Sequence, residues 1–212
     1  MEPYHKIQTI FKRDPATKFK TLLFGDYSIP EFEYLKDNTW VFTEKVDGTN
    51  IRVSFDSGKF GFRGKGENAS IPQKLVAALE EQFLPMRDEF SAHFGDTPVC
   101  LYGEGYGAKI QKGGGNYRED QGFVMFDVNI NDWWLQRKAV VELGIRLNTR
   151  TVPVIGTGTL DDMIKLVKSG ITSMWGDFMA EGIVARPAVE LFARNGDRII
   201  TKLKHRDFPV QH

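Results

Sequence analysis

Lysines set beside acidic residues and glycines are the side chains of this sequence that could do chemistry. Lys45 follows an apolar stretch and directly precedes Val46-Asp47-Gly48. A free lysine, with a pKa of about 10.4, is protonated at neutral pH and is not a nucleophile. Burial or nearby positive charge lowers a lysine pKa, and the neutral amine can then attack phosphorus. The pattern is typical of a nucleophilic lysine at a strand end, and an ordinary strand-end turn is the alternative.

Further carboxylates and a lysine pair could complete a phosphoryl-transfer site. Glu104 lies between two glycines, and Glu181 precedes a short apolar run. Carboxylates are ligands that Mg²⁺ and Mn²⁺ accept and share with phosphates. Lys202 and Lys204 alternate with apolar residues, so on a strand both would point to one face. A bound phosphate would relieve their mutual repulsion, and a solvated surface is the alternative.

Alternating hydrophobic patterns predict the strands that must position these side chains. Residues 51–55 and 59–63 alternate apolar and polar residues around Asp56-Ser57-Gly58, which predicts a hairpin. Further strands are expected at residues 40–43, 99–102, 123–128, 183–185 and 198–203, and a strand or short helix at residues 6–14. Six glycines between residues 103 and 115 predict a long irregular loop over residues 103–122.

Helix periodicity appears in three segments between these strands. Apolar residues recur at intervals of three and four after Pro72, and Pro85 is expected to kink or end that helix. A second helix is expected at residues 135–143. A third should begin after Thr159 as N-cap and stop before Gly170. Together the elements predict an α+β fold with antiparallel sheets flanked by helices.

Composition limits the class of protein. The chain has 212 residues, of which 41% are hydrophobic and 26% charged, as in globular domains. It contains neither an apolar run long enough to span a bilayer nor an N-terminal secretory signal. Its single cysteine, Cys100, lies in an apolar context and is expected to be a buried small hydrophobe. These features predict a cytoplasmic protein without membrane partners.

Charge is balanced overall but locally uneven. The 28 basic residues equal the 28 acidic ones, so net charge gives no argument for nucleic-acid binding. Three basic clusters nevertheless adjoin the candidate motifs, which favours phosphate contact over a solvated surface. They are Lys59, Arg63 and Lys65; Lys109 and Lys112; and Arg198, Lys202, Lys204, His205 and Arg206.

Five stretches, in this order, resemble motifs I, III, IIIa, IV and V of the lysyl-nucleotidyltransferase superfamily. They are Lys45-Val46-Asp47-Gly48, Tyr102-Gly103-Glu104-Gly105, Phe126-Asp127-Val128, Glu181-Gly182-Ile183-Val184-Ala185-Arg186 and Thr201-Lys202-Leu203-Lys204. The superfamily contains ATP-dependent DNA ligases, RNA ligases and mRNA capping enzymes. The resemblance covers about three-quarters of the chain and implies the ligase/capping-enzyme nucleotidyltransferase (adenylation) domain, an α+β fold.

The amino-acid sequences of the motifs most resemble those of nick-sealing RNA ligases related to RNA ligase 2. Glu44 directly precedes the lysine, and Asn50 follows where DNA ligases usually carry arginine. Residues 103–111 resemble the sequence that RNA ligases have around motif III. At Asp47 the chain departs from those ligases, which often have histidine, and agrees with DNA ligases and capping enzymes.

The resemblance implies an ATP-dependent RNA ligase that works in RNA repair by three steps. The motif I lysine attacks the α-phosphorus of ATP, with Mg²⁺ or Mn²⁺, and becomes lysyl-AMP. AMP then passes to an RNA 5′-phosphate, and a 3′-OH finally attacks that activated end, sealing the strand. Such transfers depend on in-line positioning and neutralisation of charge.

The resemblance also assigns the site residues. Catalytic roles fall on Lys45 as nucleophile, Asp47 to orient the lysine loop or a metal-bound water, Glu181 as metal ligand, and Lys202 and Lys204 on the phosphates. Nucleotide contacts fall on Glu44 at the adenine edge, Phe126 on the adenine face, Glu104 at the ribose, and Asn50, Arg63 and Arg186 at AMP or the phosphates. The alternatives are a turn-capping role for Asp47 and a core aromatic role for Phe126.

Chain length and the missing motifs shape the domain prediction. Residues 1–212 are expected to form a single nucleotidyltransferase domain, without a C-terminal OB-fold or RNA-ligase accessory domain. The expected partner is RNA with 5′-phosphate and 3′-OH ends, such as a nicked duplex, with an accessory protein as a candidate substitute for the absent domain. A fragment of a longer enzyme, an ATP-dependent DNA ligase core, a GTP-using capping-type enzyme and a non-catalytic nucleic-acid-end-binding module are the alternatives.

Overall fold

The protein, described by a computed structural model over residues 2–66 and 69–208, divides into two compact units. Within that range, the first unit contains residues 2–4 and 47–152, and the second contains residues 5–46 and 153–208. Each unit has its own sheet and its own hydrophobic core. The mixed architecture confirms the predicted α+β class.

An antiparallel five-stranded sheet forms the centre of the first unit, in the order β6-β5-β7-β8-β9. Its strands are β5 (Thr49–Asp56), β6 (Lys59–Arg63), β7 (Val99–Gly107), β8 (Gln121–Ile130) and β9 (Trp133–Trp134). The predicted hairpin is present, and both Ser57 and Gly58 have the positive φ that a tight hairpin turn requires.

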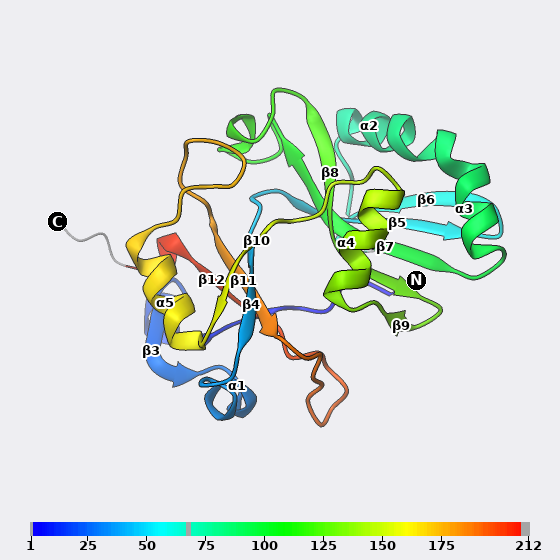
Figure 1. Cartoon of the computed structure of the whole chain (residues 1–212). Helices are drawn as coiled ribbons and strands as arrows, with labels where there is room; N and C mark the ends of the chain where they lie inside the picture. The colour runs from blue at the N-terminus through cyan, green and yellow to red at the C-terminus, as the bar shows by residue number, and fades with distance from the viewer. Residues whose placement is uncertain (1, 67–68, 209–212) are drawn as a thin grey trace. The chain divides into compact units, whose positions relative to one another are not determined.

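Three helices, blue-green to yellow-green in Figure 1, cover one face of this sheet. They are α2 (Gln73–Phe83), α3 (Arg87–Phe94) and α4 (Arg137–Arg146). Leu75, Leu79 and Phe83 of α2 pack into one core with apolar residues of β5, β7 and β8. Pro85 lies in a 3-10 turn, Leu84–Met86, between α2 and α3, so the predicted interruption of the helix is confirmed.

The glycine-rich segment is more regular than its composition predicts. β7 continues to Gly107 and β8 begins at Gln121, which leaves 108–120 outside the strands, with one 3-10 turn at Gly114–Asn116. The expectation that Glu104 follows a strand is therefore wrong, because it lies within one. A Cβ on Gly103 would lie 2.3 Å from the Val124 carbonyl oxygen, so glycine here permits close packing of β8.

A second five-stranded sheet forms the other unit, in the order β1-β12-β11-β4-β10. The strands are β1 (Gln8–Thr9), β4 (Trp40–Glu44), β10 (Val154–Gly158), β11 (Gly182–Pro187) and β12 (Thr201–Lys204), with only β1 parallel to its neighbour β12. A hairpin of β2 (Phe11–Arg13) and β3 (Leu22–Tyr27) and a short helix α1 (Pro30–Tyr34) complete this part. The last strand begins at Thr201, not at the predicted Arg198.

Helix α5 (Leu160–Ser169) confirms the capping signals in the sequence. The Thr159 Oγ1 accepts the Asp162 N–H at 3.1 Å, and Asp162 Oδ2 accepts the Thr159 N–H at 2.9 Å. This reciprocal pair satisfies amide groups that a helix start leaves without partners. The helix ends at Ser169, and the φ of 86° at the following Gly170 suits glycine.

Two further expectations concern burial and membranes. Cys100 is 1% exposed, as predicted, and burial raises the pKa of its thiol to about 11. No helix in residues 2–66 and 69–208 has the length and apolarity that a membrane crossing requires.

Candidate active site

Lys45 and Lys204 share one carboxylate in the second unit. Lys45 Nζ lies 2.6 Å from Glu181 Oε2, and Lys204 Nζ lies 2.6 Å from Glu181 Oε1. The order β12-β11-β4 causes this meeting, because Glu181 directly precedes the central strand. Two backbone bonds hold the ends together: the Lys45 N–H donates to the Gly182 carbonyl, and the His205 N–H donates to the Glu181 carbonyl, both at 2.9 Å.

These three side chains are largely buried. The exposed side-chain fractions are 19% for Lys45, 10% for Glu181 and 16% for Lys204. Burial alone would raise the pKa of Glu181, but the positive charges and hydrogen bonds of Lys45 and Lys204 outweigh it and lower that pKa. At neutral pH the site therefore holds one carboxylate anion between two side chains that can carry positive charge.

Glu44 is held by a loop that follows α5. Its carboxylate is 1% exposed; Oε1 accepts the Ser173 hydroxyl at 2.5 Å and Oε2 accepts the Met174 N–H at 2.7 Å. Burial raises the pKa of Glu44, and these two hydrogen bonds only partly offset that effect. The Ser173 hydroxyl also accepts the Trp175 N–H at 3.1 Å, so one side chain ties the loop to Glu44.

The other basic residues predicted for this unit lie on strands β11 and β12. Lys202 and Lys204 are partly buried and alternate with the fully buried Thr201 and Leu203 on β12. The expected alternation of the lysine pair is therefore present. Arg186 lies on β11, where it is 6% exposed.

In the first unit, the segment after Lys45 rests on the glycine-rich region. The Asp47 N–H donates to the Tyr117 hydroxyl at 3.2 Å, and Gln111 Nε2 donates to the Gly48 carbonyl at 3.0 Å. A Cβ on Gly48 would lie 2.3 Å from the Gly105 carbonyl oxygen. The glycine is thus required for close approach to the strand that carries the predicted Glu104.

The remaining predicted residues also belong to the first unit. Asn50 and Glu104 are direct register partners on β5 and β7. Phe126 is partly exposed at a register irregularity of β8, and the ring of Tyr4 contacts it edge-on, with centroids 5.0 Å apart. Arg63 is exposed at the end of β6. Each predicted site residue thus lies in one of the two units, and the structure brings Asn50 and Glu104 together in the first.

Glu181, the carboxylate predicted as metal ligand, has basic surroundings. Both Glu181 oxygens already contact lysine nitrogens. Across residues 2–66 and 69–208, no three His, Cys, Asp or Glu side chains converge as a metal site would need. Mg²⁺ commonly uses only one or two carboxylates together with substrate phosphates and water. Glu181 fits such a shared site once one of its carboxylate oxygens is released by the lysine that contacts it.

Sequence reasoning missed the residues that hold the predicted ones in place. Ser173 and Met174 bind Glu44 from 129 and 130 positions away, and nothing in the local pattern around them marks that contact. Tyr117 and Gln111 lie in or beside the glycine-rich segment, where the density of glycines was the only signal.

Comparison with known proteins gave matches of two kinds. A family model described as RNA ligase matches residues 38–204. A mutant Naegleria gruberi RNA ligase with ATP and Mn has a TM-score of 0.64 and 20% identity, covering 83% of this chain and 52% of that one. Naegleria gruberi RNA ligase with PPi has a TM-score of 0.64 and 19% identity, covering 96% and 57% respectively.

A third structure, another mutant of the same ligase with AMP and Mn, has a TM-score of 0.64 and 18% identity over 96% of this chain. At these identities the likeness establishes the fold. The chain spans a little over half the length of these ligases. The search of curated proteins gave no match.

Proposed function

The chain belongs to the RNA ligase family, and from that premise we propose that it is an ATP-dependent RNA ligase acting through a lysyl-AMP on Lys45. The observation that supports this most directly is the bridge from Lys45 through Glu181 to Lys204. It sets the motif I lysine within 2.6 Å of a carboxylate that also holds a second cationic side chain. The proposed nucleophile, Lys45, therefore lies close to a second lysine, Lys204, whose positive charge can bind phosphate.

The first step follows from this geometry. Lys45 Nζ must leave the Glu181 carboxylate, lose a proton to solvent and attack the α-phosphorus of ATP. A phosphorus–nitrogen bond forms, and the bond from the α-phosphorus to the bridging oxygen breaks, releasing pyrophosphate. Lys204, freed from Glu181, then offers its charge to the transferring phosphoryl group. The Naegleria relatives solved with ATP, AMP or PPi are consistent with these species as ligands.

The other assigned residues receive roles that their positions permit. Glu44 is assigned to the adenine amino edge, and this role requires one of its oxygens to exchange the hydrogen bond from Ser173 or Met174 for one from the base. Phe126, a partly exposed residue, is assigned to stack on the base. Glu104 would bind the ribose. Lys202, Arg186, Asn50 and Arg63 are assigned to phosphates, and Asp47 to the orientation of the lysine loop.

A divalent metal is part of the proposal. Mg²⁺ or Mn²⁺, shared between Glu181 and the nucleotide phosphates, would neutralise charge on the leaving pyrophosphate. The related ligases solved with Mn support the use of a divalent metal.

The proposed substrate is RNA with a 5′-phosphate and a 3′-OH, in the manner of the RNA ligase 2 branch. AMP passes from Lys45 to the 5′-phosphate, and the 3′-OH then displaces AMP to seal the strand. We assign the chemistry to residues 1–212 acting as one nucleotidyltransferase domain, in the cytoplasm, where the buried free thiol of Cys100 is compatible with reducing conditions. An accessory protein that helps to hold RNA is a further element of the proposal.

The experiment uses α-labelled ATP with magnesium, followed by denaturation and detection of label on the protein. The parent is expected to be labelled, and Lys45→Arg is expected to be unlabelled. Arginine can keep the ion pair with Glu181, but its guanidinium stays protonated and is no nucleophile. Lys165→Arg, on the exposed face of α5, is the matched control and should label like the parent.

Each outcome has a defined meaning. An unlabelled parent that is folded and supplied with Mn²⁺ as well would refute the adenylation step, as would a labelled Lys45→Arg variant. Label from GTP in preference to ATP would indicate a capping-type enzyme instead. If the adduct forms, nicked duplexes with RNA or DNA on the 3′-OH side decide the substrate, and better sealing of all-DNA nicks would indicate a DNA ligase core.

A further inference from the structure

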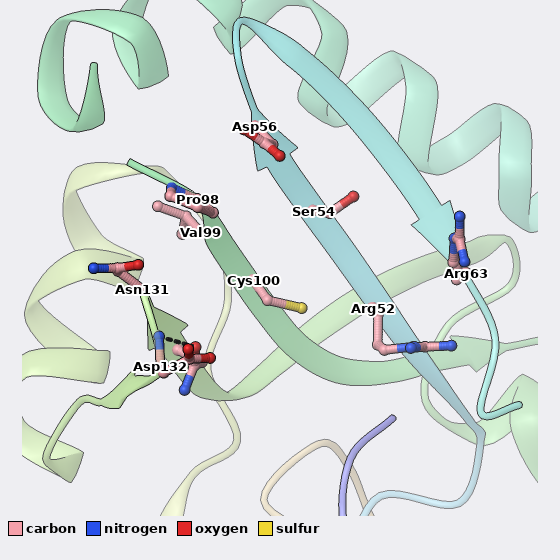
Figure 2. Close-up of a pocket in the computed structure, with 10 residues that line it drawn as sticks. Arg52, Ser54, Asp56, Arg63, Pro98, Val99, Cys100, Asn131 and Asp132 are labelled. Carbon is pink, nitrogen blue, oxygen red and sulfur yellow. Dashed lines mark hydrogen bonds between the residues drawn. The ribbon is translucent and has the colours of Figure 1, made fainter. Parts of the chain in front are cut away.

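The helices leave one face of the first unit's sheet uncovered, and polar and aromatic side chains gather there. Ser54 of β5 and Cys100 of β7 are register partners on this face. With Arg52 and Arg63, which pair on β5 and β6, they line a pocket of about 430 Å³ (Figure 2). Tyr102 lies two residues beyond Cys100 on β7, so its side chain belongs to the same face.

A β-bulge brings two consecutive residues of β8 to this face. The register between β7 and β8 shifts by one residue, and Phe126 is the extra residue on β8. Met125 before it and Val128 after Asp127 are both 0% exposed and pack in the core under the helices. A bulge re-aims side chains in this way and is common beside functional sites. Phe126 and Asp127 therefore both lie on the face that carries Tyr102.

Tyr4 contacts both residues of the bulge. Its hydroxyl donates to Asp127 Oδ2 at 2.7 Å, and its ring centroid lies 5.0 Å from that of Phe126, with 73° between the ring planes. The rings of Tyr102 and Trp134 also lie against Tyr4, with centroids 5.2 and 5.7 Å away. Tyr4 is 8% exposed and Asp127 is 0% exposed, so their hydrogen bond is shielded from water and strengthened by burial. The Tyr4 ring is therefore fixed at its hydroxyl end as well as by three neighbouring rings.

The short N-terminal segment that carries Tyr4 is itself anchored on the sheet. The Tyr102 hydroxyl donates to the Glu2 carbonyl at 2.9 Å. Residues 2–4 belong to the first unit, although residues 5–46, which follow them directly, belong to the second. The segment lies outside residues 38–204, which the RNA ligase family model matches, and it precedes all five motifs. Its contact with Phe126 is therefore a feature of the fold that the motifs do not include.

A held ring is better suited to stack on a base than a mobile one. Phe126 is the partly exposed residue assigned to the adenine face. A ring that is already ordered loses less side-chain entropy when a ligand stacks on it. A perpendicular neighbour covers no more than one face of a ring, so the contact with Tyr4 is compatible with a base on the other face.

We propose that Tyr4 is a positioning residue of the nucleotide site: anchored on Asp127, it holds the ring of Phe126 in the orientation that stacks on adenine. This inference rests on the proposed function, because that function assigns the base to Phe126. The N-terminal segment thereby contributes to nucleotide binding without touching the nucleotide.

The test measures the Kd of AMP for the full chain by isothermal titration calorimetry, because AMP carries the base but has no pyrophosphate to release. Tyr4→Leu removes the ring and the hydroxyl, and we expect it to raise this Kd about two- to tenfold. Tyr4→Phe keeps the ring and loses only the bond to Asp127, so its Kd should lie between those of the parent and Tyr4→Leu. Tyr34→Leu is the matched control, because Tyr34 is 87% exposed on α1, and its Kd should equal that of the parent.

A double-mutant cycle with Phe126 separates positioning from a purely structural role. Phe126→Leu alone should raise the Kd of AMP, and Tyr4→Leu added to it should raise the Kd no further. A residue that only stabilises the fold would lower the Tm and leave the Kd unchanged, or would change the Kd by the same factor with and without Phe126. Each titration is made well below the Tm of the variant, so that the folded protein is measured.

An unchanged Kd in Tyr4→Leu would overturn the proposal, as would the same factor in both backgrounds or an equal loss in Tyr34→Leu. If Tyr4→Leu does not fold, Tyr4→Phe takes its place in the cycle, and an unchanged Kd there overturns the proposal in the same way. A parent that ATP does not label, but whose AMP binding depends on Tyr4 through Phe126, would reject the ligase proposal and leave this inference intact. A labelled parent whose AMP binding is independent of Tyr4 would do the reverse.

Discussion

Replacing Glu181 by glutamine tests whether the two lysines depend on one carboxylate. Glutamine keeps the shape of the side chain but removes the charge that lies 2.6 Å from both Lys45 and Lys204. The variant would leave two largely buried side chains that both favour positive charge, without their common counter-ion. We therefore expect Glu181→Gln to destabilise the second unit as well as to abolish labelling by ATP.

The magnitude follows from burial and distance. At an effective dielectric of about 20, opposite charges about 3 Å apart attract by roughly 5 kcal/mol. Removing one partner of a buried pair costs about 3–5 kcal/mol, and the 10–19% exposure of these side chains lets water relieve part of that. A loss of about 2–4 kcal/mol remains, which for a chain of this size corresponds to a fall in Tm of roughly 5–12 °C.

Thermal unfolding across a pH series gives the decisive measurement. The lowered pKa of Glu181 means that its contribution is present above the usual glutamate range and is lost as pH falls through the folded-state pKa. The difference in Tm between parent and Glu181→Gln should therefore be full at neutral pH and shrink well below about pH 4.

A matched control separates this effect from charge removal in general. Asp161→Asn removes the carboxylate of the exposed pair with Lys165, and its Tm should equal that of the parent. The reasoning about Glu181 fails if Glu181→Gln unfolds at the parent Tm at neutral pH, or if the difference grows as the pH falls.

Two further substitutions test the supports of the site. Ser173→Ala should raise the pKa of Glu44 further, because it removes a hydrogen bond to the charged carboxylate. The free energy of unfolding should therefore fall by about 1.5–3 kcal/mol at alkaline pH and by less in acid. Urea unfolding at both pH values measures this, and an equal loss at the two would contradict the assigned hydrogen bond. Gly48→Ala would place Cβ 2.3 Å from the Gly105 oxygen, so it should lower the free energy of unfolding by about 1–3 kcal/mol and slow labelling by ATP. Gly66→Ala, at a position with open space around it, is the control and should change neither.

Local signals in the sequence were reliable where a few neighbouring residues set the outcome. Thr159 and Gly170 bounded α5 as predicted, because capping involves groups within one turn. The segment 154–158 was missed as a strand because it carries glycines and little alternation, and its pairing with β4 comes from tertiary packing. Strand β3 was also missed, because it is largely exposed and its sequence therefore has no alternating hydrophobic pattern.

The sequence by itself determined the family. The motif order from Lys45 to Lys204 is a linear property, and the RNA ligase match over residues 38–204 confirms the family assignment. Only the tertiary structure decided that Glu181 bridges the two lysines, that Ser173 holds Glu44, and that Arg52 lies opposite Arg63. Such contacts depend on strand order and register, which many distant residues fix together and no local pattern encodes.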